Sequence, residues 1–369
     1  MRRVDVFSLK PGLKVGRTIY NQRGEVLLKA GALLTPGYIS KLINHGVPFV
    51  FIDDGLLPDI KVKDVIAEET RVAAVQQVKK VLLDTQESGR LVIEPQSFYQ
   101  TVSRFTSDLL SQESLMLNLV DLRDQDNYTF AHSVNVCVLS IMTGITMGFS
   151  REELAVLGIG ALLHDLGKVM IPDEILNKPG RLTPEEFSIM KQHPIHGYNL
   201  IRSAEGLDDI PAIIALQHHE SYDGSGYPYG IKGADFHLYS QITAIADKFD
   251  ALTANRIYRR AYPPHEAYEM CAASGNYLFD SCVVEKFLHN IAAYPTGTLV
   301  ELNNGQTAIV LDTPKGYSLF PRVRVLFDSS GRPLPSPEEI SLVDEDEITV
   351  VKVLNNNEVQ RLLEKLGLS

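Results

Sequence analysis

Two segments of the chain end an apolar run with a pair of polar side chains. His164 and Asp165 follow "GIGALL", and His218 and His219 follow "IIALQ". An ionised carboxylate at the inner end of a buried helix is unfavourable unless a positive charge neutralises it. A cation would do so, because imidazole and carboxylate groups are metal ligands. The chain is therefore expected to fold into helices whose ends meet around bound cations.

Further candidate ligands lie in the same part of the chain. Seven of the ten histidines fall within 106 positions, which is more than chance clustering explains. Two of them, His196 and His237, are expected to be ordinary core or surface histidines. The candidate metal ligands are His132, His164, Asp165, His193, His218, His219 and Asp247.

The type and number of these ligands indicate two metal ions. Imidazoles and carboxylates without thiolates suit iron, manganese or zinc better than a structural zinc site built from cysteines. Five histidines and two aspartates exceed one tetrahedral shell, so two ions that share a carboxylate would use them all. Asp165 is the expected bridge, because the neighbouring His164 can bind one ion while Asp165 spans both.

Composition limits the class of protein. A length of 369 residues suggests two or three domains, and 44% hydrophobic with 22% charged residues is ordinary for a soluble globular chain. The net charge of −11 disfavours DNA or RNA polymers as partners. Cys137, Cys271 and Cys282 form no CxxC pair, and the opening residues lack the apolar core of a signal peptide. A reducing, cytoplasmic location is expected.

One stretch is apolar enough to require a membrane test. Residues 127–150 contain no Asp, Glu, Lys or Arg, and the stretch is long enough to span a bilayer. It also contains His132, Asn135 and two glycines. We therefore expect a helix buried inside a globular bundle and no membrane span.

The first third of the chain predicts two segments. In residues 1–58, "VGRTIYNQRGEVLLKAGALLT" predicts a hairpin that turns at Arg23 and Gly24, "TPGYISKLINHGV" a helix and "PFVFIDD" a short strand. This is a small α+β module. Residues 59–122 carry apolar side chains at helical intervals. They predict a helical linker, either a connecting hairpin or a segment that forms a homodimer.

The remaining chain also divides in two. Residues 123–293 are predominantly helical in pattern and hold the candidate ligands. After Pro295, "GTLVELNNGQTAIVLD" predicts a hairpin around Asn-Asn-Gly, while "RVRVLFDSSGRPL" and "EITVVKVL" add strands. Residues 294–369 are thus expected to form a small β-rich domain with a terminal helix. The fold class is mainly α, a helical bundle with a small module on either side.

Charged side chains near the candidate ligands suit a phosphate substrate. Two ions about 3.5 to 4 Å apart can hold a bridging hydroxide for attack on a phosphodiester. Lys168 lies four residues after His164, so both can share a helix face and Lys168 can contact a phosphate oxygen. Asp250 lies three residues after Asp247 and could orient Lys168 or a water. Arg256 offers a bidentate fork for phosphate.

A glycine-rich loop follows His218 and His219. "DGSGYPYGIKG" cannot be helical, and it predicts tight turns with close backbone approach. Its position directly after candidate metal ligands suggests that Gly226, Tyr227 and Pro228 form one wall of the site. Tyr227 could stack on, or hydrogen-bond with, a base or ribose.

These motifs resemble the HD-GYP subgroup of HD-domain phosphohydrolases. The resemblance is carried by "HDLGK" at 164–168, "HHE" at 218–220, "DGSGYP" at 223–228 and "ADKFDALTANRIYR" at 246–259, and it covers about residues 123–293. It implies an HD-type helical bundle and a bacterial signalling enzyme, a phosphodiesterase that cleaves cyclic di-GMP to pGpG and often GMP. It also implies a metal centre of two or three ions, commonly iron or manganese.

The resemblance implies a role for each matching residue. One metal would be held by His132, His164, Asp165 and Asp247, and a second by Asp165, His193 and His218. His219 matches a position that serves a third metal where one exists. The catalytic residues would be Lys168, Asp250 and Asp165. Substrate contacts would come from Lys168, Arg256, Gly226, Tyr227 and Pro228.

One position departs from the family pattern. Three-metal members carry a glutamate four residues before the first histidine, where this chain has Tyr128. A third metal is therefore not expected, and His219 would be free to hydrogen-bond. The expected main product is pGpG.

Two alternatives to a cyclic di-GMP phosphodiesterase remain. The chain could be an HD phosphohydrolase for another nucleotide, which the GYP loop disfavours. It could also be a catalytically weak receptor that binds a cyclic dinucleotide and signals to other proteins through its flanking modules. The presence of all the metal ligands disfavours that reading.

Overall fold

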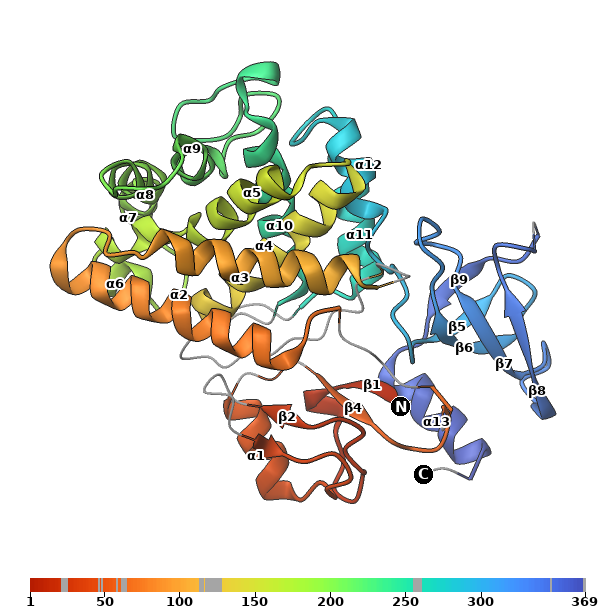
Figure 1. The fold of residues 1–369 in the computed structure, drawn as a ribbon. Coiled ribbons are helices and arrows are strands. Elements are labelled where there is room, and N and C mark those ends of the chain that lie inside the picture. Colours follow the sequence, from red (N-terminus) through yellow and green to blue (C-terminus); the bar gives the residue numbers. More distant parts are fainter. Residues whose placement is uncertain are drawn as a thin grey trace. The chain divides into compact units, whose positions relative to one another are not determined.

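The computed structural model divides into two compact units (Figure 1). The first contains Met1–Asp64, Met116–Asp126 and Ile291–Ser369, and the second contains Val65–Leu115 and Asn127–Asn290. The four segments expected from the sequence remain predictions, and the structure groups the first and last of them in one unit. The structure describes residues 1–20, 26–45, 47, 49–57, 59–60, 65–112, 116, 128–254, 261–345 and 347–367.

The second unit is helical, which confirms the predicted fold class. Its longer helices are α2 (Glu68–Ser88), α3 (Pro95–Leu110), α4 (Tyr128–Thr146), α5 (Arg151–Leu163), α8 (His193–Arg202), α9 (Asp209–Gln217), α10 (Leu238–Thr253), α11 (Pro264–Ala272) and α12 (Ser281–Leu288). Shorter helical turns are η3 (Leu166–Met170), α6 (Asp173–Leu176), α7 (Pro184–Met190) and η4 (Gly233–Asp235).

The charge-free stretch forms the central helix of this unit. Helix α4 packs against α2, α5, α10 and α12. Its side chains from Ala131 to Ser140 are buried apart from the half-buried Asn135, which explains why the stretch lacks charged residues. Within the described residues, no helix combines the length and the apolar character that crossing a bilayer would require.

The helical linker packs on the bundle. Helix α2 buries Ala74, Val75 and Val78, and it contacts α3, α4 and η3. Helix α3 buries Phe98 and Phe105 and contacts α4 and α5. The apolar spacing of these helices is therefore satisfied within one chain. A homodimer through this segment stays a prediction.

The N-terminal part of the first unit matches the expected elements. Strand β1 (Arg2–Asp5) pairs antiparallel with β4 (Phe49–Ile52), and β2 (Ile19–Tyr20) pairs with β3 (Val26–Leu28). The short helix η1 (Val6–Ser8) lies between β1 and β2 in the sequence, and α1 (Pro36–Asn44) lies between β3 and β4. The Thr35 hydroxyl caps the first turn of α1. The predicted turn at Arg23 and Gly24 lies outside the described residues.

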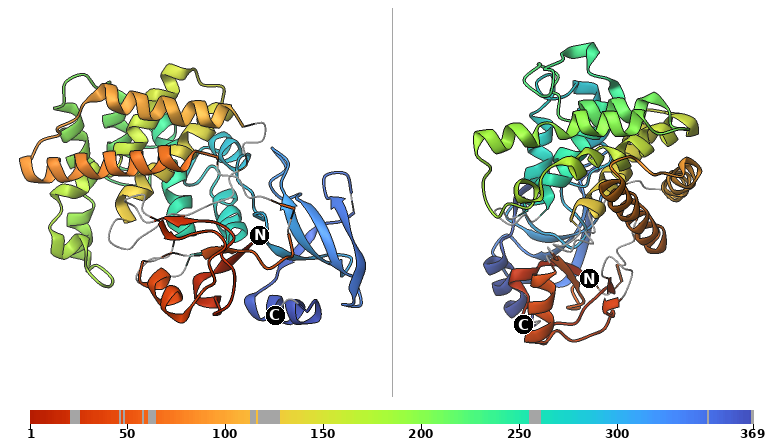
Figure 2. Two further views of the ribbon diagram at one scale, coloured as in Figure 1. Left: turned by 60° about the horizontal axis from the view of Figure 1, so that its bottom comes forward. Right: turned by 90° about the vertical axis from the view of Figure 1, so that its left-hand side faces the viewer.

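The C-terminal part is a five-stranded antiparallel sheet in the order β8-β7-β6-β5-β9. The blue arrows of Figure 2 are strands of this sheet. Leu56 and Leu57, which follow β4, share a hydrophobic core with this sheet and with Val359 and Leu363 of the last helix. The elements are β5 (Leu299–Leu302), β6 (Thr307–Asp312), β7 (Arg322–Phe327), β8 (Pro333–Ser341), β9 (Val350–Val353) and α13 (Asn356–Lys365).

In the helical unit, a glycine brings η3 against α8. A Cβ at Gly167 would lie 1.9 Å from the carbonyl oxygen of His193 and 2.4 Å from the amide nitrogen of Gly197. Both atoms belong to the backbone and cannot move aside without shifting α8. The glycine of "HDLGK" therefore allows the turn after α5 to approach the helix that begins at His193.

We expect Gly167→Ala to lower the free energy of unfolding by about 3 kcal/mol or more, because the added methyl overlaps backbone atoms. Gly275→Ala is the matched control in the same unit. Its Cβ would lie 3.6 Å from the Ser281 side chain, so the change should stay within about 0.5 kcal/mol. Urea denaturation of both variants measures the difference. Equal stabilities would contradict the close approach.

Candidate metal centre

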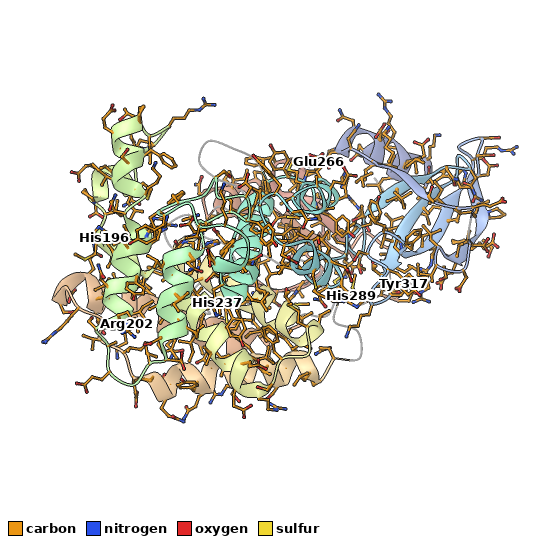
Figure 3. All side chains as sticks on the ribbon, turned by 90° about the horizontal axis from the view of Figure 1, so that it is seen from above. His196, Arg202, His237, Glu266, His289 and Tyr317 are labelled. Atoms are coloured by element: carbon orange, nitrogen blue, oxygen red, sulfur yellow. The ribbon has the colours of Figure 1, made fainter. Side chains whose placement is uncertain are left out.

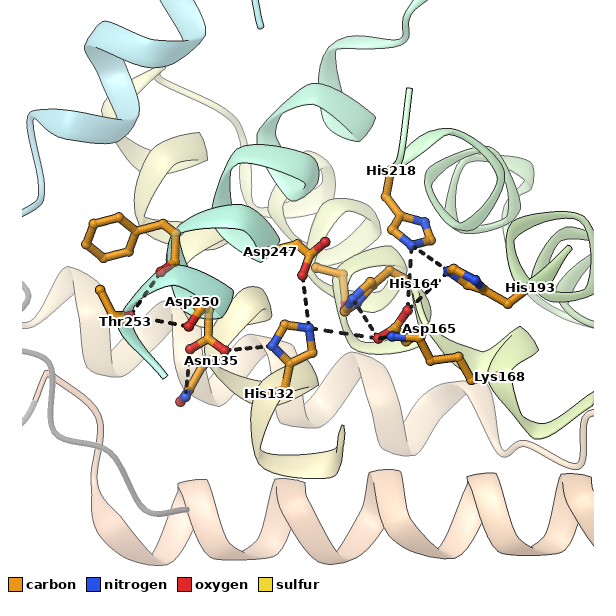
Figure 4. Close-up of polar contacts among 12 residues, drawn as sticks. His132, Asn135, His164, Asp165, Lys168, His193, His218, Asp247, Asp250 and Thr253 are labelled. Carbon is orange, nitrogen blue, oxygen red and sulfur yellow. Dashed lines mark hydrogen bonds and ion pairs between the residues drawn. The ribbon is translucent and has the colours of Figure 1, made fainter. Parts of the chain in front are cut away.

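The predicted ligands come together where several helices of the second unit end or cross (Figure 4). His164 and Asp165 directly follow α5, and His218 directly follows α9. His193 is the first residue of α8. His132 projects from α4 and Asp247 from α10. Residues more than 100 positions apart in the sequence thus face one another.

Three of the imidazoles are oriented in the same way. His164, His193 and His218 each hold Nδ1 2.8 Å from the carbonyl oxygen three residues earlier in the chain. A carbonyl oxygen only accepts hydrogen bonds, so Nδ1 carries the proton and donates. In the neutral ring, Nε2 then presents a lone pair, as metal-binding histidines require.

The ring nitrogens fit a cation. The Nε2 atoms of His193 and His218 lie 3.3 Å apart although each presents a lone pair. Among the described residues, His164 Nε2 and Asp165 Oδ1 are buried and have no hydrogen-bond partner. Buried polar atoms are normally satisfied, and a positive ion between these atoms would satisfy all of them. The donor set therefore fits bound divalent metal.

Asp165 occupies the centre of the cluster. Its Oδ1 lies 3.5 Å from His193 Nε2 and 3.6 Å from His218 Nε2, while its Oδ2 lies 3.4 Å from His164 Nε2 and 3.8 Å from His132 Nε2. The ligand atoms form two groups, and Asp165 belongs to both. One group is His132, His164 and Asp165, and the other is Asp165, His193, His218 and His219.

Asp247 completes the side of the cluster near His132. Its Oδ1 lies 3.1 Å from His132 Nε2. Burial would raise the pKa of the Asp247 carboxyl, but the surrounding imidazoles outweigh burial and lower that pKa. Asp247 is therefore ionised and available to a cation at neutral pH.

Lys168 balances part of the negative charge. Its Nζ lies 2.5 Å from Asp165 Oδ2, and its side chain is 26% exposed. Burial would raise the pKa of the Asp165 carboxyl, but Lys168 and His164 hold it well below its usual value. Burial, together with Lys168, lowers the pKa of His193 to about 3, so its ring is neutral and able to bind metal.

Asp250 lies behind His132. Its side chain is fully buried, and its Oδ2 accepts a hydrogen bond from His132 Nδ1 at 2.6 Å. Its Oδ1 accepts from Asn135 Nδ2 at 3.1 Å. The sequence suggested that Asp250 could orient Lys168 or a water, whereas these contacts orient His132. Asn135 was not among the predicted site residues, although its position three residues after His132 places both on one helix face.

The GYP loop folds against the residues that follow α9. A Cβ at Gly226 would lie 2.4 Å from the Cα of Glu220, which confirms the close backbone approach expected of this loop. The buried Glu220 carboxylate accepts hydrogen bonds from the amides of Tyr229 at 2.7 Å and Ile231 at 3.2 Å. Glu220 was also missed as a site residue, although it directly follows the adjacent histidines.

The aromatic ring of the loop packs on a candidate ligand. The Tyr227 ring stacks on His219 with centroids 4.7 Å apart, and Pro228 follows it. On another side the Tyr227 ring meets the edge of the exposed Phe187 ring on α7. One face of Tyr227 is therefore occupied by His219. A contact between Tyr227 and a base or ribose stays a prediction.

Among the described residues, His196 and His237 do not belong to the clustered ligand groups. His196 lies half-buried on α8, and His237 begins α10, where its Nδ1 accepts from the Tyr239 amide (Figure 3). Both roles agree with the expectation that these are ordinary histidines. Arg256 lies outside the described residues, as does the side chain of Tyr128, so their predicted roles stay predictions.

The sequence of this chain is similar to those of known proteins. An HD domain family model matches residues 105–283, and a model described as a KOW domain associated with HD domain matches residues 299–362. A cyclic di-GMP phosphodiesterase of Pseudomonas aeruginosa is 32% identical over 279 residues, covering 74% of this chain and 67% of that relative. This chain belongs to the HD-GYP family of cyclic di-GMP phosphodiesterases.

Two further relatives show the range of the HD-GYP family. A cyclic di-GMP phosphodiesterase of Thermotoga maritima is 41% identical over 183 residues, covering 49% of each protein. A 3'3'-cGAMP-specific phosphodiesterase of Vibrio cholerae is 36% identical over 176 residues, covering 47% of this chain and 33% of that relative. The chain thus spans half or less of these two relatives. The HD-GYP resemblance and the phosphodiesterase class are confirmed.

We expect added Mn²⁺ to raise the melting temperature of the wild-type protein, because an ion that binds the folded state stabilises it. The gain is about 2.7 kcal/mol at one hundred times the dissociation constant. Asp165→Asn should lose most of this gain, while Asp235→Asn, an exposed change on η4, should keep it. Differential scanning fluorimetry after chelation and metal addition measures the effect. An equal gain in both variants would argue against Asp165 as a shared ligand.

Proposed function

We propose that this chain hydrolyses cyclic di-GMP to pGpG with the help of two divalent ions, iron or manganese. The observation that carries the proposal is the position of Asp165 between two groups of ligand atoms. The Pseudomonas aeruginosa and Thermotoga maritima relatives, both named cyclic di-GMP phosphodiesterases, support the substrate. The candidate ligand atoms are oxygens and nitrogens, with no thiolate among them, and this supports iron or manganese as the metal.

The proposed ligand sets follow the two groups, except that Asp247 joins the first set and His219 is left out of the second. Bound divalent ions would supply a water of lowered pKa and positive charge beside the phosphate oxygens. Asp165 faces both groups, and the fixed Nδ1 hydrogen bonds keep the histidine Nε2 atoms directed inward. One set is His132, His164, Asp165 and Asp247, and the other is Asp165, His193 and His218.

Lys168 is the proposed phosphate-binding cation. Its ammonium group contacts Asp165 and its side chain is partly exposed, which supports a role as donor to a phosphate oxygen beside the ligands. Arg256 is proposed as a second phosphate contact. Gly226, Tyr227 and Pro228 are proposed to form the wall of the site next to His219.

Asp250 has a different proposed role from the one expected at first. A fully buried carboxylate that accepts from His132 Nδ1 cannot contact substrate through that oxygen. We therefore assign it as a positioning residue for His132. A carboxylate partner fixes the tautomer of a metal-binding histidine and raises its basicity.

The number of ions bears on the product. Three-metal members of the family have a glutamate at the position of Tyr128. Because this chain lacks that carboxylate, we propose two bound ions and pGpG as the main product. His219 lies with Asp165, His193 and His218, and its ring supports Tyr227. A metal content above two ions per chain would overturn this part of the proposal.

A second candidate substrate is 3'3'-cGAMP. The Vibrio cholerae relative named for that substrate matches nearly half of this chain. Both dinucleotides carry the same phosphodiester linkages, so the metal centre alone does not separate them. A cytoplasmic location, a homodimer and other signalling partners stay predictions.

We expect anaerobically purified protein loaded with Fe²⁺ or Mn²⁺ to convert cyclic di-GMP to pGpG, with slower cleavage of 3'3'-cGAMP. Chromatographic separation of the nucleotides over time measures both. His164→Ala and Asp165→Ala should abolish turnover, because each removes a ligand. Folded, metal-loaded protein that leaves cyclic di-GMP intact would overturn the proposal, and binding without cleavage would favour a receptor.

Lys168→Met should lower kcat for cyclic di-GMP by about a hundredfold, because it removes a positive group beside the reacting phosphate. Lys286→Met is the control, since Lys286 pairs with the adjacent Glu285 on the exposed side of α12. Steady-state kinetics with Mn²⁺ measures both variants. An unchanged kcat for Lys168→Met would remove Lys168 from the catalytic residues.

A further inference from the structure

A charged side chain is buried on the helix that precedes the HD domain. Arg71, near the start of α2, is only 7% exposed. The other buried side chains in this part of α2, Ala74, Val75 and Val78, are apolar. A buried guanidinium is costly unless hydrogen bonds compensate it, so its partners determine what it does.

One partner of Arg71 is a side chain of the central helix. Arg71 donates through Nη1 to Asn135 Oδ1 at 2.8 Å. Because an arginine can only donate, this bond fixes which end of the Asn135 amide faces α2. The amide nitrogen is then left to face the opposite direction, where it donates to Asp250 Oδ1 at 3.1 Å.

The contacts continue to a predicted metal ligand. Asp250 accepts from His132 Nδ1 at 2.6 Å, and His132 Nε2 faces Asp247 and Asp165 (Figure 4). The two oxygens of Asp250 thus hold Asn135 on one side and His132 on the other. A continuous row of hydrogen bonds connects the guanidinium of α2 to the imidazole in the cluster.

We propose that Arg71 is a positioning residue that fixes His132 for metal binding through Asn135 and Asp250. This role rests on the metal centre proposed above. Without Arg71, the Asn135 amide can reverse and place its oxygen against the Asp250 carboxylate. Asp250 would then turn or lose its bond, and His132 would lose the partner that sets its tautomer and its direction.

The location of Arg71 makes this role separate from the ligand motifs. Arg71 lies outside residues 105–283, which the HD domain family model matches. It reaches the site from the helical linker, which the sequence suggested only as a connection or a dimerisation segment. Part of the support for the metal centre therefore comes from outside the matched domain.

Mn²⁺ affinity, measured by titration calorimetry on the full chain, tests the proposal. Arg71→Met should weaken affinity about tenfold, as changes next to metal-binding histidines do. Arg71→Lys should weaken it less, because an ammonium can still donate to Asn135. Gln77→Met is the matched control. Gln77 lies on α2 and bonds Ser97 and Thr101 on α3, so this change removes polar contacts of α2 without touching the row to His132.

A double variant separates positioning from a general loss of stability. If Arg71 acts through Asn135, Arg71→Met combined with Asn135→Leu should bind Mn²⁺ no more weakly than Asn135→Leu alone. Gln77→Met should leave the affinity within twofold of wild type even where its melting temperature falls. If Arg71→Met does not fold, Arg71→Lys provides the comparison.

The outcomes are distinct. Wild-type affinity in a folded Arg71 variant would overturn the positioning role and leave the proposed function intact. An equal loss in Gln77→Met, or additive losses in the double variant, would also overturn it. Wild-type protein that binds no Mn²⁺ would overturn the metal centre itself and, with it, the role of Arg71.

Discussion

A carboxylate buried among imidazoles is unfavourable unless positive charge balances it, and Asp165 is in that position. Its two oxygens face different groups of histidines, and its side chain is almost inaccessible to solvent. Lys168 supplies one positive charge from the next turn. The remaining unsatisfied atoms, including Asp165 Oδ1 and His164 Nε2, are those that divalent ions would bind. The packing of α5, α8 and α9 around this point is explained by that requirement.

Local backbone contacts orient three of the clustered histidines. Three histidines stand at the beginning of a helix or just after its end, and each donates to the carbonyl three residues earlier. Helix ends leave backbone carbonyls without intrahelical partners, and the imidazoles use them. Glycine at 167 then allows the turn after α5 to lie against α8. The backbone therefore orients these three histidines, whereas the Asp250 side chain orients His132.

The ligands could be predicted from the sequence because they stand out in two ways. Paired polar residues after apolar runs, as at His164 and Asp165, are rare in an ordinary core. Histidines were also dense over one segment. Alternating apolar residues and turn residues predicted strands in both small modules, and the antiparallel β5–β6 pair is an example.

Residues that support the ligands were not predictable in the same way. Asn135 and Arg71 each belong to a helix whose buried side chains are mostly apolar, and a polar residue there has many possible partners. The i+3 spacing of Asp250 and Asp247 was visible, but it could not tell whether Asp250 faces Lys168 or His132. That choice depends on the crossing of α4 and α10, which brings together residues 118 positions apart.

The contact between Arg71 and Asn135 indicates that the functional unit begins before residue 105. A fragment starting at residue 105, where the family match begins, would keep every proposed metal ligand and still lack α2. Its α4 would expose apolar surface that α2 normally covers, and Asn135 would face water. The smallest self-sufficient catalytic piece therefore includes the helical linker.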